Sequence, residues 1–105
     1  MTPSPRRPLR RVIKVGTSLL RGSAQRDTAA VIADLAQALS ARQQLGEQLV
    51  LVTSGAVGLG AAALRLATRP TEVVALQAAA AVGQGRLMGL YEGAFGRHGV
   101  PVAQV

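Results

Sequence analysis

The sequence predicts an α/β fold with a mainly parallel sheet, because strand-like and helix-like segments alternate along most of its 105 residues. Two strand-like runs, Arg10–Val15 and Gln48–Thr53, are separated by a helical pattern at 27–44. The second run, QLVLVT, is almost continuously apolar, which is typical of a parallel strand buried on both faces. A third run, VPVAQV at 100–105, predicts another strand. Right-handed crossovers bring the ends of consecutive strands to one edge of the sheet, where ligands of open α/β folds bind.

The segment at 27–44 has the start and stop signals of a helix. Asp27 or Thr28 can cap its beginning, and Gly46 is placed to end it. Apolar residues recur on one face at helical spacing: Ile32, Leu35 and Leu39. This face is expected to pack on the sheet.

Two further helices are predicted after the second strand. An Ala-rich helix at 56–67 ends before Pro70, and Thr71 is placed to cap a long helix at 72–97. The long helix carries a stripe of glycines at four-residue spacing: Gly85, Gly89 and Gly93. We interpret this stripe as a close-packing surface.

Composition sets limits on location and domain organisation. The absence of cysteine excludes disulfides and Cys-ligated metals and fits a cytoplasmic protein. No apolar segment follows the basic start, and no run of about 18 apolar residues occurs, so neither a secretory signal nor a membrane span is predicted. Residues 1–9, with three prolines, are expected to form a flexible arm, and 10–105 to be part of one domain.

The formal net charge of +7 raises the possibility of a basic, non-catalytic nucleic-acid-binding module. Four arginines crowd the start, and the others are spread singly along the chain. Because no aromatic residues are interleaved with them, a base-stacking surface is not indicated. Nucleic-acid binding is therefore kept as the rival from another functional class.

Lys14, the only lysine, lies in an apolar strand directly before a Gly16-Thr17-Ser18 loop. A compact ammonium group suits a phosphate oxygen, and Gly16 lets a phosphate approach the backbone closely. The alternative is a strand lysine that points to water. Leu19 and Leu20 are interpreted as an extension of the strand before the chain turns at 21–23.

A second candidate site follows the next strand, in the segment VTSGAVGLG at 52–60. Ser54 offers a hydroxyl group, and the helix that follows offers backbone amides to an anion. The alternative is a plain strand-to-helix turn capped by Ser54. The segment matches neither the dinucleotide fingerprint nor the P-loop.

None of the five acidic residues lies in the two strand-end loops, so we identify no magnesium ligand and no general base. That pattern fits phosphoryl transfer to a carboxylate, which is already ionised and needs no base. Such a reaction depends mainly on positioning and charge stabilisation.

Three segments together resemble the glutamate 5-kinases of the amino-acid kinase family: VIKVGTSLL at 12–20, LVLVTSGAVGLG at 49–60 and ALQAAAAVGQGRLMGLYEGAF at 75–95. The resemblance covers nearly all of the chain from about Arg11. It implies an αβα sandwich, use of ATP with Mg²⁺, and transfer of the γ-phosphoryl group to the side-chain carboxylate of glutamate. It further implies proline biosynthesis, possible inhibition by proline and a homo-oligomer.

The resemblance also implies roles for individual residues. Lys14 would be catalytic and, with Gly16 and Thr17, would contact the ATP phosphates. Glutamate would be bound by the second loop: Ser54, Gly55 and Ala56. Kinases acting on acetylglutamate, aspartate or UMP are the alternatives within the family. Since the family's kinase domain is longer, these 105 residues are expected to be a C-terminally incomplete part of it and inactive alone.

Overall fold

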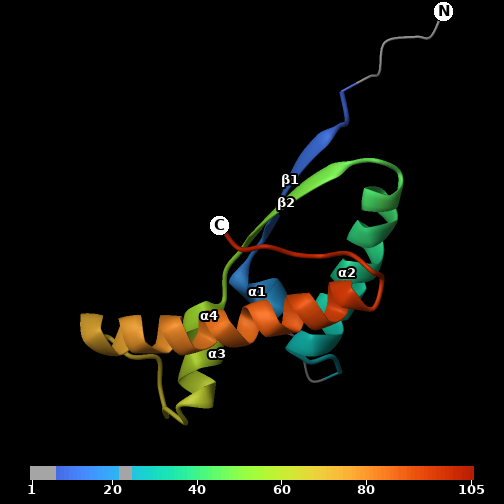
Figure 1. The fold of residues 1–105 in the computed structure, drawn as a ribbon. Helices are drawn as coiled ribbons and strands as arrows, with labels where there is room; N and C mark the ends of the chain where they lie inside the picture. Colours follow the sequence, from blue (N-terminus) through green and yellow to red (C-terminus); the bar gives the residue numbers. More distant parts are fainter. Residues whose placement is uncertain (1–6, 22–24) are drawn as a thin grey trace, which may run out of the picture.

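The computed structural model describes residues 7–21 and 25–105, in which the first two predicted strands and the three predicted helices occur in the predicted order (Figure 1). In chain order they are β1 (Arg10–Val15), α1 (Thr17–Leu20), α2 (Thr28–Gln44), β2 (Gln48–Thr53), α3 (Ala56–Ala63) and α4 (Val73–Gly96). Most of the predicted arm and most of the predicted turn at 21–23 lie outside the described residues. The α/β class is confirmed.

The sheet consists of β1 and β2, which pair in parallel with Arg10 opposite Gln48 and Val15 opposite Thr53. Side chains alternate between its two faces. One face packs into the core, with Val15 buried and Leu51 partly buried. The other face is bare, and three valines on it are 72%, 57% and 49% exposed: Val12, Val50 and Val52. The prediction of a second strand buried on both faces is wrong for the described residues, because their helices cover only one face.

The core lies where α1, α2 and α4 meet the covered face of the sheet. Its buried side chains are mainly aliphatic, with two aromatic rings from α4: Val15, Leu20, Ile32, Ala36, Leu87, Tyr91, Ala94 and Phe95. The hydroxyl group of Thr28 donates a 2.6 Å hydrogen bond to the Leu20 carbonyl, which fixes the start of α2 against α1.

The predicted signals of α2 are confirmed. The Asp27 carboxylate accepts a 2.8 Å hydrogen bond from the Ala30 amide and caps the helix. Gly46, with φ of +93°, allows the chain to leave the helix in a conformation that L-residues rarely adopt. Ile32 is fully buried, and Leu35 and Leu39 pack against the core.

Two glycines set the close crossing of α3 and α4, but they are not in the predicted stripe. A Cβ at Gly60 would overlap the Ala79 carbonyl, and a Cβ at Gly83 would overlap the Ala56 carbonyl. By contrast, a Cβ at Gly85, Gly89 or Gly93 would meet nothing within 4 Å. The interpretation of the stripe as a packing surface is therefore wrong within the described chain.

The last six residues do not form the predicted third strand. The Val100 amide donates to the Phe95 carbonyl at 3.1 Å and closes a turn after α4, with Gly99 at φ of +70°. The segment at 100–105 then runs back toward β2 (Figure 1). Val100 and Val102 pack against the core without joining the sheet.

Smaller differences concern where helices begin and end. Leu19 and Leu20 belong to α1, not to an extension of β1. Helix α3 ends at Ala63, before the predicted end, and Glu72 rather than Thr71 is the N-cap residue of α4. By length and composition alone, α4 could cross a membrane, since its mean hydropathy reaches 1.2. This is weak evidence, because apolar helices that serve a core, as α4 does with Leu87 and Phe95, pass the same criterion.

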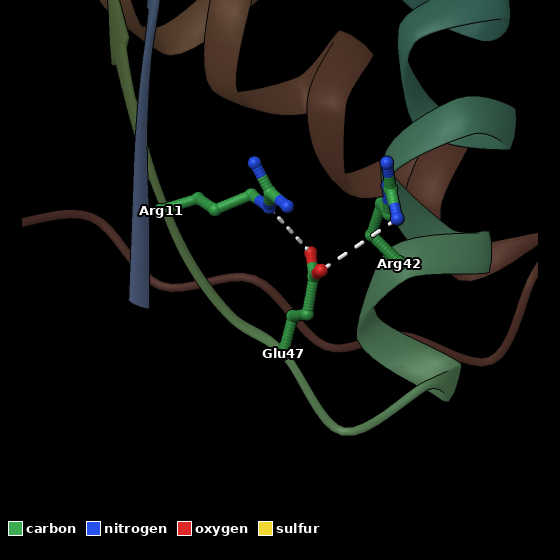
Figure 2. Close-up of polar contacts among 3 residues, drawn as sticks. All are labelled: Arg11, Arg42 and Glu47. Atoms are coloured by element: carbon green, nitrogen blue, oxygen red, sulfur yellow. Dashed lines mark hydrogen bonds and ion pairs between the residues drawn. The ribbon is translucent and has the colours of Figure 1, made fainter. Parts of the chain in front are cut away.

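An ion-pair cluster closes the amino end of the sheet (Figure 2). The Glu47 carboxylate lies 2.9 Å from Nε of Arg11 in β1 and 3.7 Å from a terminal nitrogen of Arg42 in α2. Beside it, Arg10 Nε donates to Gln48 Oε1 at 2.7 Å. These contacts fix the loop between α2 and β2 onto β1.

Candidate functional site

The candidate site lies at the carboxyl edge of the sheet, where β1 and β2 end side by side. The Ser54 amide donates to the Val15 carbonyl at 3.2 Å, which continues the strand pairing by one residue. The chain then enters α1 through Gly16 and α3 through Gly55. Both predicted loops therefore lie at one edge, as parallel pairing requires.

A hydrogen bond joins the two loops directly. The hydroxyl oxygens of Thr17 and Ser54 are 2.9 Å apart. Ser54 Oγ also lies 3.3 Å from the Val15 carbonyl, to which it donates, so Thr17 is the donor to Ser54. Both residues are exposed, and a ligand at this edge can reach both hydroxyl groups.

Lys14 lies one residue before the end of β1, opposite Val52 in the register. Its side chain is exposed on the bare face of the sheet. Among the described residues, the Lys14 ammonium group has no hydrogen bond or ion pair. The cation next to the two hydroxyl-bearing loops therefore lacks a protein counter-charge in this part of the chain, which favours an anionic ligand.

The two loop glycines, Gly16 and Gly55, differ in backbone conformation. Gly55 has φ of +101°, a left-handed conformation that disfavours other residues, and it leads directly into α3 at Ala56. Gly16 has an ordinary extended conformation, but a Cβ there would meet nothing within 4 Å. The space next to the Gly16 backbone, directly before Thr17, is therefore open.

Sequence reasoning missed Tyr91, which reaches the same edge from α4. Its hydroxyl oxygen lies 2.9 Å from Thr53 Oγ1, at the end of β2, and the residue is only 3% exposed. Burial raises the pKa of the Tyr91 phenol. A signal was available, because the only tyrosine of the sequence lies four residues after Leu87 on the apolar face of a helix.

The donors at this edge suit anions. They are the Lys14 ammonium group and the backbone amides at the starts of α1 and α3, and they fit phosphate or carboxylate oxygens. The Thr17 and Ser54 hydroxyl groups already donate to Ser54 and to the Val15 carbonyl, so each donates to a ligand only by exchanging that hydrogen bond. A magnesium ion needs carboxylate or other oxygen ligands. The described residues contain no group of three or more His, Cys, Asp or Glu side chains that could hold a metal.

An α/β fold with donors suited to anions at the ends of parallel strands is typical of a broad class of nucleotide- and phosphate-handling domains. Comparison with known families shows which family within this class the chain matches. The model of the amino acid kinase family matches residues 9–105, and the chain belongs to this family.

Several curated relatives of this chain are named glutamate 5-kinase. Glutamate 5-kinase from Synechococcus sp. (strain CC9902) is 62% identical over 94 residues, which are 90% of this chain and 25% of the relative. The glutamate 5-kinases of Synechococcus sp. (strain CC9605) and Prochlorococcus marinus (strain MIT 9313) are 60% and 58% identical over the same length, which covers 25% and 26% of those relatives. The chain thus spans about a quarter of the length of the curated relatives it matches.

Proposed function

We propose that this chain forms the phosphate-binding and glutamate-binding edge of a glutamate 5-kinase. The whole enzyme would transfer the γ-phosphoryl group of ATP to the side-chain carboxylate of L-glutamate. The observation that carries the proposal is the 2.9 Å contact between Thr17 and Ser54, because it joins the two loops beside Lys14, whose ammonium group has no partner among the described residues. The identity to glutamate 5-kinases supports glutamate as the acceptor.

Each side of this edge has a separate role in the proposal. Lys14 is the catalytic residue, and its ammonium group stabilises charge on the transferring phosphoryl group, with Gly16 and Thr17 beside the ATP phosphates. Ser54, Gly55 and Ala56 bind glutamate through the Ser54 hydroxyl group and the backbone amides at the start of α3. The acceptor carboxylate attacks in its ionised form and needs no general base.

Mg²⁺ would accompany ATP and neutralise phosphate charge. The residues described here supply donors for the phosphates, whereas carboxylate ligands for the ion would come from other parts of the kinase. The product, glutamyl 5-phosphate, is the first intermediate of proline biosynthesis, so a cytoplasmic location, inhibition by proline and a homo-oligomeric enzyme belong to the same proposal.

A chimaera tests the proposal with this chain's own residues. In it, these 105 residues replace the matched segment of the glutamate 5-kinase from Synechococcus sp. (strain CC9902). We expect ATP-dependent formation of glutamyl hydroxamate when hydroxylamine traps the product. Glutamate, aspartate, acetylglutamate and UMP are compared as acceptors by the release of ADP, because UDP formed from UMP does not react with hydroxylamine. The unaltered relative is the control.

The outcome separates the candidate acceptors. Turnover with glutamate at a kcat/KM at least about a hundred times that for the other acceptors supports the proposal. A chimaera that melts cooperatively but prefers aspartate, acetylglutamate or UMP would assign the chain to another kinase of the family. A folded chimaera that phosphorylates none of the four acceptors would contradict the proposed kinase activity.

A further inference from the structure

We propose that Tyr91 is a positioning residue for the glutamate-binding loop and acts through Thr53 on the Ser54–Gly55 peptide. The inference rests on the proposed function, since it assumes that glutamate binds at Ser54. It concerns a side chain on α4 that lies outside both strand-end loops.

The hydrogen bonds have a definite direction. Thr53 Oγ1 donates to the Ser54 carbonyl oxygen at 3.3 Å. A hydroxyl group has only one proton, so the 2.9 Å contact between Thr53 Oγ1 and the Tyr91 hydroxyl requires Tyr91 to be the donor. The relay therefore runs from the Tyr91 hydroxyl group to Thr53 and then to the carbonyl of Ser54.

This relay fixes the orientation of one peptide group. The described chain has no cis peptide bond, and in a trans peptide the carbonyl and the next amide point in opposite directions. Holding the Ser54 carbonyl toward Thr53 therefore turns the Gly55 N–H away from Thr53. Within the described residues this N–H has no hydrogen-bond acceptor, and it precedes the start of α3, where anions are favoured.

Tyr91 is held firmly enough to act as the fixed end of the relay. Its ring is 3% exposed and stacks on Phe95, with ring centroids 6.4 Å apart. Both rings belong to α4, which packs against α2 and α3. The phenol thus transmits the position of α4 to the loop that would bind the substrate carboxylate.

Tyr91→Phe in the chimaera tests the inference, because it keeps the ring and removes only the hydroxyl group. We expect KM for glutamate to rise roughly three- to tenfold, as for one lost neutral hydrogen bond, while kcat and KM for ATP change less than twofold. Thr53→Val should give the same change, and the double variant should be no worse than either single variant. Ile32→Val in α2 is the matched control, since it loosens the same core and leaves Tyr91, Phe95 and Thr53 unchanged. It should lower Tm and leave KM for glutamate unchanged.

A second readout does not need activity. Ser54–Gly55 is the only Ser-Gly pair in this sequence, so ¹³C-carbonyl serine with ¹⁵N-glycine selects its amide, and Ser54→Ala identifies the peak by removing it. We expect Tyr91→Phe to shift this peak and speed its hydrogen exchange, and Ile32→Val to leave it in place. A Gly55 peak that is unchanged in Tyr91→Phe overturns the relay.

The two proposals fail in different ways. A folded chimaera without glutamate turnover removes the proposed function, and the Gly55 amide still tests the relay. An active chimaera in which Tyr91→Phe leaves KM for glutamate unchanged, or raises both KM values equally, removes the positioning role and leaves the proposed function standing.

Discussion

The two ends of the β1–β2 sheet treat charge in opposite ways. At the amino end, Glu47 pairs with both Arg11 and Arg42, so each of these two guanidinium groups has an acidic partner (Figure 2). At the carboxyl end, neutral hydroxyl groups bond to one another, and the Lys14 ammonium group has no partner in the described chain. In the described chain, the Arg11 and Arg42 guanidinium groups at the amino end have protein partners, whereas the Lys14 ammonium group at the carboxyl end has none and stays available for an anion.

The largest effect is expected when the 105 residues are produced without the rest of the proposed kinase. We expect the 105-residue polypeptide alone to form no glutamyl hydroxamate, because the described residues bring no carboxylate cluster for magnesium to this edge. We also expect it to associate through the bare sheet face formed by Val12, Val50 and Val52. Light scattering and a thermal melt measure the second effect.

Two results would contradict this prediction. A monodisperse monomer with a cooperative melt would contradict the association. Turnover by the isolated polypeptide that Lys14→Ala abolishes would show that these residues suffice for catalysis. As a matched control, replacing the three valines by threonine should reduce association while leaving strand propensity high.

Removing the Lys14 ammonium group should have the next largest effect. Lys14→Ala in the chimaera should lower kcat by about a hundredfold, roughly 3 kcal/mol in the barrier, with a smaller change in KM for glutamate. Lys14→Arg should also be poor, because a planar guanidinium group does not replace a point charge. Arg11→Met, at the amino end, is the control and should leave kcat unchanged. An unchanged kcat for Lys14→Ala would exclude the catalytic role.

Ser54→Ala tests whether the two loops at the carboxyl end bind glutamate and ATP separately. Loss of a hydrogen bond to a charged carboxylate should cost about 1.5–3 kcal/mol and appear in the use of glutamate. ATP affinity should stay nearly intact, although Thr17 and Ser54 are in contact. Thr17→Val serves as the matched variant from the phosphate side. If Ser54→Ala weakened ATP and glutamate equally, the two loops would form one undivided site.

The support of the carboxyl end by α4 depends on a close helix crossing. Gly83→Ala should lower the free energy of unfolding by about 1–3 kcal/mol, because the added methyl group would overlap the Ala56 carbonyl. Gly89→Ala, on the open side of the same helix, should instead stabilise by up to about 1 kcal/mol. Chemical denaturation of the chimaera measures both changes, and equal effects would contradict the described crossing.

The amino end should show the smallest effect. Glu47→Gln should lower the free energy of unfolding by about 0.5–1 kcal/mol, since Arg11 and Arg42 are about half exposed. Its effect should shrink as salt is raised, and both KM values should remain unchanged. A selective change in KM for either substrate would show that the two ends are coupled.

Local chemistry explains why much of the fold could be predicted. The Asp27 cap, the glycine stop at Gly46 and the limits of both strands depend on neighbours in the sequence, and all are confirmed. The strand predicted at 100–105 is wrong, because a strand exists only where a partner strand offers hydrogen bonds. Its first amide is used by the turn after α4.

Packing glycines could not be chosen from spacing alone. Gly85, Gly89 and Gly93 have the regular spacing, yet Gly60 and Gly83 make the contacts. Which helix face meets a neighbour depends on the crossing of α3 and α4, and the sequence of one helix does not contain that information.

The sequence by itself determined the alternation of strands and helices, and it placed Lys14, Gly16, Thr17 and Ser54 at strand ends that parallel pairing brings to one edge. Only the tertiary structure decided that Thr17 bonds to Ser54 and that Tyr91, 38 residues after Thr53, reaches the same edge. The reason is physical. Strand ends and caps follow from local backbone preferences, whereas a hydrogen bond between distant side chains depends on how the helices pack.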